Sequence, residues 1–319
     1  MTRILVTGAG GFIGSHLARH LYNRGHFIRV VDMKWDGYIE NPYYSQKITA
    51  DLRNLDCCLK ATRHMDQVYN LAADMGGIGY ITTVSADVQR NNVLINTNML
   101  EAARRNDVKT FFFSSSACVY PNYLQEEAEV APLRESDAMP ADPNEAYGWE
   151  KLFTEVLCES YRVDYGMDTR VARYHNVYGP EGTWCGGREK APAALCRKVA
   201  EARDGGIIEI WGDGWQTRSF LYIDDCVEAS VKLMASNFQK PINIGSDRLV
   251  TINELTDVIV MASGKTLTKR HDVSKPQGVR GRNADLTLVK RVLDWSPLVS
   301  LEVGLEKTYK WIAEQSRLS

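Results

Sequence analysis

The sequence predicts an α/β fold with a doubly wound parallel sheet and a smaller C-terminal substrate-binding lobe. Short β-branched or aromatic runs alternate with helical patterns through the first half of the chain, and a glycine-rich turn joins the first strand to the first helix. The length of 319 residues is about twice that of a common single domain, so two lobes with a sizeable core are expected.

The first expected strand covers residues 3–7, and a helix follows at residues 12–24 with apolar side chains at helical spacing. Further strands are predicted at residues 27–32, 67–72, 110–116, 169–174, 207–211 and 241–244. Further helices are predicted at residues 88–105, 144–161, 223–234 and 301–312. Residues 179–187 form a turn-rich loop that is too glycine-dense for a plain connector.

The change of pattern after Tyr174 divides the chain into two parts. We expect a dinucleotide-binding domain at residues 1–173, with return segments near residues 220–246. Residues 174–319 are expected to form the substrate-binding lobe.

Composition and charge argue against several classes of protein. The 38 Lys and Arg residues nearly balance the 40 Asp and Glu residues, so the basic excess of a general nucleic-acid binder is missing. No apolar run reaches membrane-spanning length, and the start MTRILV lacks the pattern of a secretory leader. The seven scattered cysteines indicate free thiols in the cytoplasm, and the histidines have no metal-ligand spacing.

A glycine motif follows the first strand. Gly8, Gly11 and Gly14 have the spacing G-x-x-G-x-x-G, which lets backbone N–H groups approach a pyrophosphate at the start of a helix. A tight turn alone would also explain these glycines. However, Asp32 ends the next strand, where a carboxylate contacts a ribose 2′-hydroxyl and repels a 2′-phosphate, so the pattern predicts NAD in a Rossmann-type domain. The cofactor residues expected here are Gly8, Gly11, Phe12, Ile13, Gly14 and Asp32.

Tyr147 and Lys151 stand four residues apart on a predicted helix, so they share one face. Tyrosine is a poor base at neutral pH, but a neighbouring lysine and the positive nicotinamide ring would lower its pKa. Alone, this spacing is a common surface pattern. Behind a phosphate cradle and after the strand at residues 110–116, it predicts a base that takes a proton from a sugar hydroxyl.

With these motifs, nearly the whole chain resembles the extended short-chain dehydrogenase/reductase family, which includes the nucleotide-sugar epimerases and dehydratases. Matching segments are GAGGFIG at residues 8–14, DLR at 51–53, NLAA at 70–73, SSS at 114–116, RYHNVYGP at 173–180 and RSFLYIDD at 218–225. The resemblance implies that Asp51 and Leu52 lie on the adenine side and that Ser116 hydrogen-bonds the reacting hydroxyl. It also implies a homodimer built through the helices at residues 88–105 and 144–161.

Two further residues distinguish this chain within the family. Cys118 follows Ser116 and Ala117, where the family's 4,6-dehydratases carry a threonine and two acidic residues. Its thiol can exchange a proton near neutrality. The alternative is that Cys118 only fills space as a small buried apolar side chain. Lys190 follows a glycine loop and precedes a predicted helix, where it could enter a sugar site or simply face solvent.

Cys118, Lys190, the loop at residues 75–79 and the segment at 211–218 together resemble the GDP-mannose 3,5-epimerases of this family. The resemblance implies oxidation at C4 by Tyr147 and NAD, and proton exchange at C5 and then C3 by Cys118 as base and Lys190 as acid. Implied substrate contacts are Gly76, Gly77, Ser116, Ala117, Cys118, Asn176, Glu189, Lys190, Lys198, Trp215, Gln216, Arg218 and Arg280. Guanine and mannose rest on the resemblance alone. A nucleotide-sugar 4-epimerase and a non-catalytic NAD-binding sensor are the alternatives.

Overall fold

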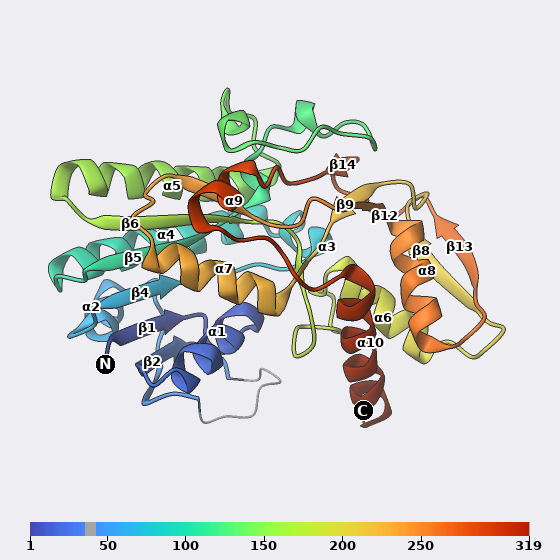
Figure 1. Cartoon of the computed structure of the whole chain (residues 1–319), viewed down its shortest axis with the longest axis horizontal. Helices are drawn as coiled ribbons and strands as arrows, with labels where there is room; N and C mark the ends of the chain where they lie inside the picture. The colour runs from blue at the N-terminus through green and yellow to red at the C-terminus, as the bar shows by residue number, and fades with distance from the viewer. Residues whose placement is uncertain (36–42, 319) are drawn as a thin grey trace.

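A seven-stranded parallel sheet forms the centre of the larger lobe in the computed structural model, which describes residues 1–35 and 43–318 (Figure 1). Its strand order is β11–β6–β5–β4–β1–β2–β3. The strands are β1 Arg3–Thr7, β2 Phe27–Asp32, β3 Gln46–Thr49, β4 Gln67–Asn70, β5 Thr110–Ser116, β6 Asp168–Tyr174 and β11 Pro241–Ile244. The predicted fold class is confirmed.

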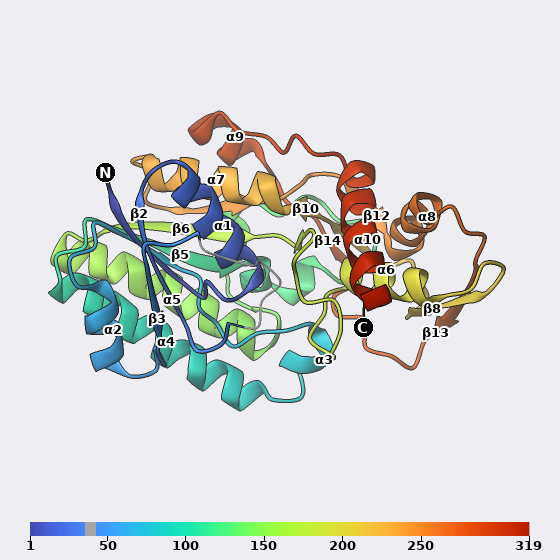
Figure 2. The same ribbon diagram turned by 90° about the horizontal axis from the view of Figure 1, so that it is seen from below.

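Helices cover both faces of this sheet (Figure 2). One face carries α1 Phe12–Asn23, α7 Ile223–Ala235 and α9 Thr287–Leu293. The other carries α2 Leu55–Thr62, α4 Ser85–Arg105 and α5 Glu145–Tyr165. Because the sheet is covered on both sides, central strands can be apolar throughout, and Phe111, Phe112 and Phe113 of β5 are all fully buried.

The order of the strands reverses between β1 and β4. From β1 the chain winds outward to β2 and β3, whereas β4 begins the run to β5, β6 and β11. The carboxyl ends of β1 and β4 therefore flank the topological switch point, where open α/β sheets bind their ligands.

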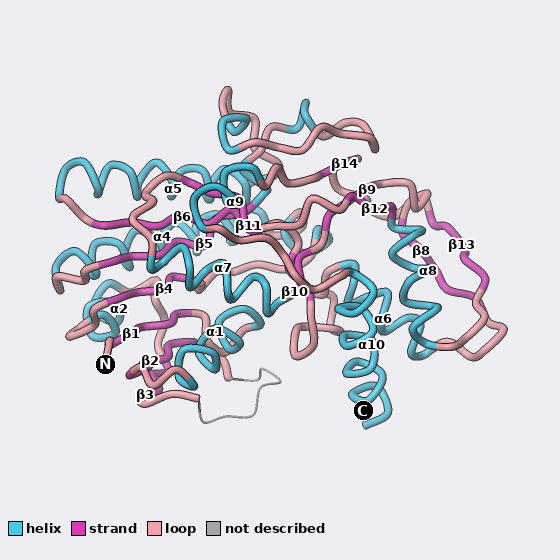
Figure 3. Tube along the Cα trace, in the orientation of Figure 1, coloured by secondary structure: helices cyan, strands magenta, loops and turns pink. Residues whose placement is uncertain are grey.

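The smaller lobe lies at the carboxyl ends of the strands (Figure 3). Its helices are α6 Ala191–Glu201, α8 Ile252–Ser263 and α10 Leu301–Leu318, and α10 packs on the other two. Its strands are β8 Ile207–Trp211, β13 Thr268–Asp272, β9 Thr217–Ser219, β12 Leu249–Thr251 and β14 Gly281–Arg282. The short strands β7 Val177–Tyr178 and β10 Leu221–Tyr222 pair between the lobes, and α3 Ile78–Ile81 follows β4.

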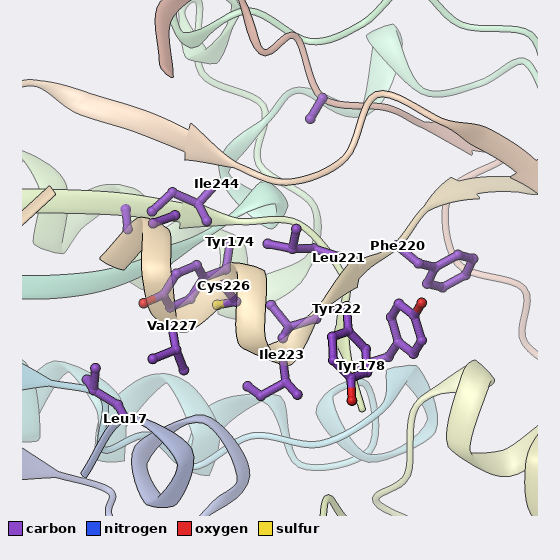
Figure 4. Close-up of a cluster of buried hydrophobic side chains, with 14 of the residues drawn as sticks. Leu17, Tyr174, Tyr178, Phe220, Leu221, Tyr222, Ile223, Cys226, Val227 and Ile244 are labelled. Carbon is purple, nitrogen blue, oxygen red and sulfur yellow. The ribbon is translucent and has the colours of Figure 1, made fainter. Parts of the chain in front are cut away.

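Buried aromatic and aliphatic side chains join α7 to α1 and to the segment after β6 (Figure 4). Leu17, Tyr174, Tyr178, Ile223 and Val227 belong to this one cluster. The cluster fixes the end of β6 and the start of α7 against the helix that begins at the glycine turn.

The predicted elements of the larger lobe are confirmed, with shifts at their ends. The strand expected at residues 67–72 ends at Asn70, because the Thr7 hydroxyl oxygen accepts hydrogen bonds from both Leu71 N and Ala72 N at 3.1 Å. Helix α5 continues beyond residue 161 to Tyr165, where Gly166 in the left-handed region (φ 67°) ends it.

A buried ion pair holds α5 against the sheet. Arg173 of β6 donates to Glu155 of α5, with Nη2 at 2.7 Å from Oε2 and Nε at 3.0 Å from Oε1. The hydroxyl of Ser115 on β5 donates to the same carboxylate. The pair therefore connects α5 to β5 and β6 directly beside Ser116.

We expect Arg173→Met to lower the free energy of unfolding by about 3–5 kcal/mol, because the Glu155 carboxylate would stay buried without its partner. Urea unfolding followed by circular dichroism measures this change. The matched control is Arg162→Met, which removes a pair with Glu159 on the exposed side of the same helix and should change stability little. Equal losses in the two variants would contradict the role given to the buried pair.

Candidate active site

A cleft of about 590 Å³ lies at the switch point of the sheet. Every residue predicted to bind the cofactor lines it, from the glycine turn, β2, the segment after β3 and helix α5. These are Gly8, Gly11, Phe12, Ile13, Gly14, Asp32, Asp51, Leu52, Tyr147 and Lys151.

The glycine turn has no room for side chains. Gly8 has φ 68°, and a Cβ there would lie 2.8 Å from Ala72 N; a Cβ on Gly14 would lie 2.2 Å from the carbonyl oxygen of Gly8. Helix α1 begins after Gly11, and no described side chain caps it. Its first N–H groups are therefore available to a phosphate, and the turn fits the pyrophosphate of a dinucleotide.

Two carboxylates lie beside this turn. Asp32 is held by the backbone, since its Oδ2 accepts from Gly10 N at 2.9 Å and its Oδ1 accepts from Met33 N at 2.7 Å. Asp51 accepts from Arg53 Nη2 at 2.6 Å, and this hydrogen bond lowers the pKa of the Asp51 carboxyl. Both carboxylates fit contacts to the adenosine part of NAD.

Tyr147 and Lys151 come from the first turns of α5 and are both buried. The Lys151 ammonium lies 5.3 Å from the centre of the Tyr147 ring and 3.6 Å from a Glu150 carboxylate oxygen. Burial raises the pKa of the Tyr147 phenol well above its ordinary value, and the charge of Glu150 adds to this rise. Burial therefore dominates the pKa of this phenol, and Lys151 is also paired with Glu150. The lowered pKa that the sequence predicts from Lys151 and the nicotinamide ring together stays a prediction.

Ser116 and Cys118 reach Tyr147 because α5 approaches the turn after β5 very closely. The carbonyl oxygen of Cys118 accepts from Asn144 N at 2.9 Å, and a Cβ on Gly148 would lie only 2.2 Å from it. Ser116 hydrogen-bonds the Tyr147 side chain, and its hydroxyl oxygen accepts from Cys118 N at 3.2 Å. Glycine at position 148 is therefore required for this contact.

Lys190 borders the same cleft at the start of α6. Its side chain is exposed to the open cleft, yet protein walls surround it and lower the pKa of its ammonium. The charge of Cys118 acts in the opposite direction on that pKa, so the two groups lie within electrostatic reach of each other. Tyr147 and Lys190 thus line the same cleft, and Cys118 packs in the cluster that contains Tyr147.

Sequence reasoning missed Arg282, which contacts the candidate base. Arg282 of β14 is only 6% exposed, and its Nη1 donates to the Cys118 sulfur at 3.5 Å. Its Nη2 has no hydrogen-bond partner among the described residues. The nearby Arg280, which was predicted to contact substrate, instead pairs with Asp213 at 2.8 Å. Arg282 differs from Arg280 in that it lies in β14, which pairs with β9. No pattern in the local sequence could have distinguished the two arginines.

The predicted substrate contacts fall into two groups. Gly76, Ser116, Asn176 and Lys190 line the cleft, while Gly77, Ala117, Cys118 and Glu189 lie next to them in the chain. Lys198, Trp215, Gln216, Arg218 and Arg280 do not line the cleft and belong to the smaller lobe. Polar side chains of the first group have internal partners besides those given above for Ser116 and Cys118. Asn176 Nδ2 donates to Ser219 O at 3.0 Å, and Glu189 accepts from Gly187 N at 2.7 Å.

The second group surrounds Trp211 and the turn that follows it. Gln216 Nε2 donates to Trp211 O at 2.9 Å, and the Lys198 ammonium lies 5.5 Å from the Trp211 ring centre. Arg218 is enclosed and donates to backbone carbonyl oxygens, including Val279 O at 2.6 Å; burial lowers its pKa. Lys198 also lies 3.6 Å from a Glu209 carboxylate oxygen. This surface combines cations and indole rings outside the cofactor cleft.

The NAD dependent epimerase/dehydratase family model matches residues 4–245. The chain belongs to this family. Members depend on NAD, and the glycine turn, the two carboxylates and the Tyr147–Lys151 pair fit that cofactor. Among family members of known structure, UDP-glucuronic acid 4-epimerase from Bacillus cereus, in complex with UDP-glucuronic acid and NAD, is 30% identical with a TM-score of 0.83 and covers 98% of this chain and 99% of its own.

Two curated family members are more similar in sequence. GDP-mannose 3,5-epimerase 1 of Oryza sativa subsp. indica is 52% identical over 98% of this chain and 82% of its own length. GDP-mannose 3,5-epimerase of Arabidopsis thaliana is 49% identical over the same shares of the two chains. The family and these relatives identify the chain as an isomerase that acts on a nucleotide sugar.

Neither a metal centre nor a membrane span is found in the part of the chain that the structure describes. Within residues 1–35 and 43–318, no three His, Cys, Asp or Glu side chains are grouped so that they could hold a metal ion. The helices of these residues also lack the length and apolar character needed to cross a bilayer.

We expect Gly148→Ala to lower the free energy of unfolding by about 1–3 kcal/mol, because the added methyl group overlaps the Cys118 carbonyl oxygen and forces α5 away from the turn. Urea unfolding provides the measurement. Gly79→Ala is the control, since an added Cβ there meets no described atom within 4 Å. If Gly148→Ala unfolded at the same urea concentration as the wild type, α5 would not be held by this contact.

Proposed function

We propose that this chain epimerises GDP-α-D-mannose at C3 and C5, giving GDP-β-L-galactose and GDP-L-gulose. The placement of Tyr147 and Lys190 on one cleft, with Cys118 packed in the cluster that contains Tyr147, carries the proposal. The 52% identity to the rice GDP-mannose 3,5-epimerase 1 supports this choice of substrate.

Inversion at C5 or C3 requires removal of a C–H proton that is not acidic until C4 becomes a ketone. When bound, NAD would supply a positively charged ring that takes up hydride from C4 and later returns it. Tyr147 would accept the proton of the C4 hydroxyl, with Ser116 hydrogen-bonded beside it. Because burial keeps the phenol neutral, positive charge near Tyr147 is needed for this role, and Lys151 contributes part of it.

Cys118 and Lys190 would then exchange the proton at C5, and afterwards at C3, once Cys118 has given its proton to water and Lys190 has taken one up. The thiolate of Cys118 removes the proton from the carbon, and the ammonium of Lys190 delivers another, so the configuration inverts. The lowered pKa of Lys190 supports this role, because an ammonium group with a lower pKa is a stronger acid and releases its proton more readily. The guanidinium of Arg282 donates to the sulfur at 3.5 Å and would hold the Cys118 side chain in place for this step.

The surface around Trp211 is our proposed site for the guanosine diphosphate. Arg218 and Arg280 bear guanidinium groups that suit phosphate, and to bind it they would have to exchange their present partners, which are backbone carbonyl oxygens and Asp213. Trp215 is exposed enough to stack on a base. Residues 1–173, with returns near 220–246, would bind NAD, and residues 174–319 would bind substrate; the pairing of β11 with β6 supports these returns. The seven free cysteines support a reducing compartment, and we infer a cytoplasmic location.

We expect the wild-type protein to introduce deuterium at C5 and C3 of GDP-mannose in D₂O, as measured by proton NMR. Cys118→Ala and Lys190→Ala should each slow this exchange by about 10²–10⁴-fold, since each removes one proton-transfer group, while NAD binding is kept. Cys185→Ala and Lys310→Ala, which change exposed groups outside the cleft, are the matched controls.

The same spectra separate the proposal from its alternative. Inversion at C4 without deuterium at C5 or C3, unchanged in Lys190→Ala, would instead identify a 4-epimerase. The Bacillus cereus structure is the observation that keeps this alternative open. Function that survives Tyr147→Phe would favour a non-catalytic NAD sensor.

We also propose that two copies of the chain pair through α4 and α5. Trp149, Phe153 and Val156 of α5 are 46%, 49% and 52% exposed and follow one another at helical spacing. Leu94 on the neighbouring α4 is 41% exposed. Apolar side chains gathered on one helix face support an interface with an identical face.

The double variant Trp149→Glu/Phe153→Glu should be a monomer in analytical ultracentrifugation, whereas the wild-type chain should sediment as a dimer. Two carboxylates at the centre of an apolar interface would be desolvated without partners. Met261→Glu introduces the same charge at an exposed methionine of α8 and should leave the dimer intact. A monomeric wild type, or a dimeric double variant, would contradict this interface.

A further inference from the structure

Two loops that border the cleft are fastened to each other by three side chains. One segment follows β4, with Asp74 in its loop and Tyr80 in the short helix α3; the other is the loop that precedes Lys190 and contains Arg188. We call Asp74, Tyr80 and Arg188 the cleft clasp.

The three members of the cleft clasp contact one another pairwise. The Arg188 guanidinium lies 3.8 Å from the centre of the Tyr80 ring, and its Nη1 lies 3.6 Å from Asp74 Oδ1. The Tyr80 hydroxyl donates to the same carboxylate oxygen at 2.9 Å. A stacked, charged and hydrogen-bonded triad of this kind fixes the guanidinium in one orientation.

The backbone reinforces the clasp. Gly77 N donates to the carbonyl oxygen of Arg188 at 3.1 Å, and a Cβ on Gly77 would lie 2.6 Å from the carbonyl oxygen of Glu189. The two loops are therefore in direct contact just before Lys190.

The segment before Lys190 contains two glycines that do not hold it in place. Gly186 and Gly187 have φ 87° and 84°, and an added Cβ on either meets no described atom within 4 Å. Such glycines allow the chain to turn freely. The end of the loop nearest to Lys190 is held by Arg188 and by Glu189, which accepts from Gly187 N and pairs with Arg197 of α6 at 3.2 Å.

The clasp is also connected through hydrogen bonds to Glu150 and Lys151 of α5. Asn91 Nδ2 donates to Asp74 Oδ2 at 3.0 Å, and Asn92 Nδ2 donates to both Asp74 O and Glu150 Oε1 at 3.0 Å. Glu150 in turn pairs with Lys151. An unbroken polar chain therefore runs from Arg188 to the lysine beside Tyr147.

We propose that Arg188 is a positioning residue: through the cleft clasp it holds Lys190 at the distance and angle needed for proton delivery. The role toward a sugar carbon rests on the proposed function, whereas the hold on the loop does not. Proton transfer falls steeply with small errors of placement, so a loosened loop slows the step that Lys190 serves.

The test compares Arg188→Gln, Arg188→Lys and Tyr80→Ala with the wild type. Amide hydrogen exchange of residues 75–81 and 186–190, measured by mass spectrometry on the free protein, should accelerate about tenfold or more in Arg188→Gln and Tyr80→Ala. Deuterium entry at C5 of GDP-mannose should slow about 10–10²-fold in kcat while KM changes little. Arg188→Lys, which keeps a cation on the ring, should recover part of both effects, and Arg317→Ala is the exposed control.

The outcomes separate the possible roles of Arg188. Unchanged amide exchange in Arg188→Gln would overturn the clasp. Faster amide exchange with an unchanged kcat would overturn the positioning role, and a large rise of KM with a protected loop would show instead that Arg188 contacts substrate directly. If the wild type leaves the sugar protons unexchanged, the proposed function fails, and the amide exchange still decides whether the clasp holds the loop.

Discussion

The close approach of helix α5 to the turn after β5 is the constraint on which the rest of the site depends. Because residue 148 is a glycine, the Cys118 carbonyl oxygen can occupy the space that a side chain at position 148 would need. Ser116 and Cys118 therefore reach Tyr147. The buried Glu155–Arg173 pair fixes the same helix seven residues further along the chain, and the Ser115 hydroxyl of β5 donates to the same Glu155 carboxylate. A backbone contact and a charge contact thus act together: one sets how near α5 comes, and the other sets its angle to the strands.

Burial then decides the electrostatics of the groups held in this way. It raises the pKa of Tyr147 and lowers the pKa of Lys190, so both groups move toward their neutral forms. A lysine near a tyrosine is therefore insufficient to make a base, because Lys151 is shared with Glu150. Proton transfer by Tyr147 would therefore need a further positive charge, which the nicotinamide ring of NAD would supply when bound.

The sequence was most informative where the chemistry is local. The glycine turn, Asp32 and the strands of the larger lobe follow from spacing and periodicity, because a buried parallel sheet needs continuous apolar runs such as residues 110–113. Short elements of the smaller lobe, including β9, β12 and β14, were not predicted, since two- or three-residue strands carry no period. Arg282 and the cleft clasp were missed for a related reason: each joins residues far apart in the chain, and only the assembled sheet brings them together.

The site combines a part common to the family with two additions that are held independently. The glycine turn, Ser116, Tyr147 and Lys151 are the residues that we propose for reversible oxidation at C4, which every nucleotide-sugar 4-epimerase requires. Cys118 is held by the α5 contact and by Arg282, whereas Lys190 is held by the start of α6 and by the loop of Arg188. These supports share no residue with each other, but each reaches the oxidation machinery: the first through α5, which carries Tyr147, and the second through Asp74, Asn92 and Glu150 to Lys151. One scaffold can serve 4-epimerases and, with both additions in place, an enzyme that inverts the neighbouring carbons.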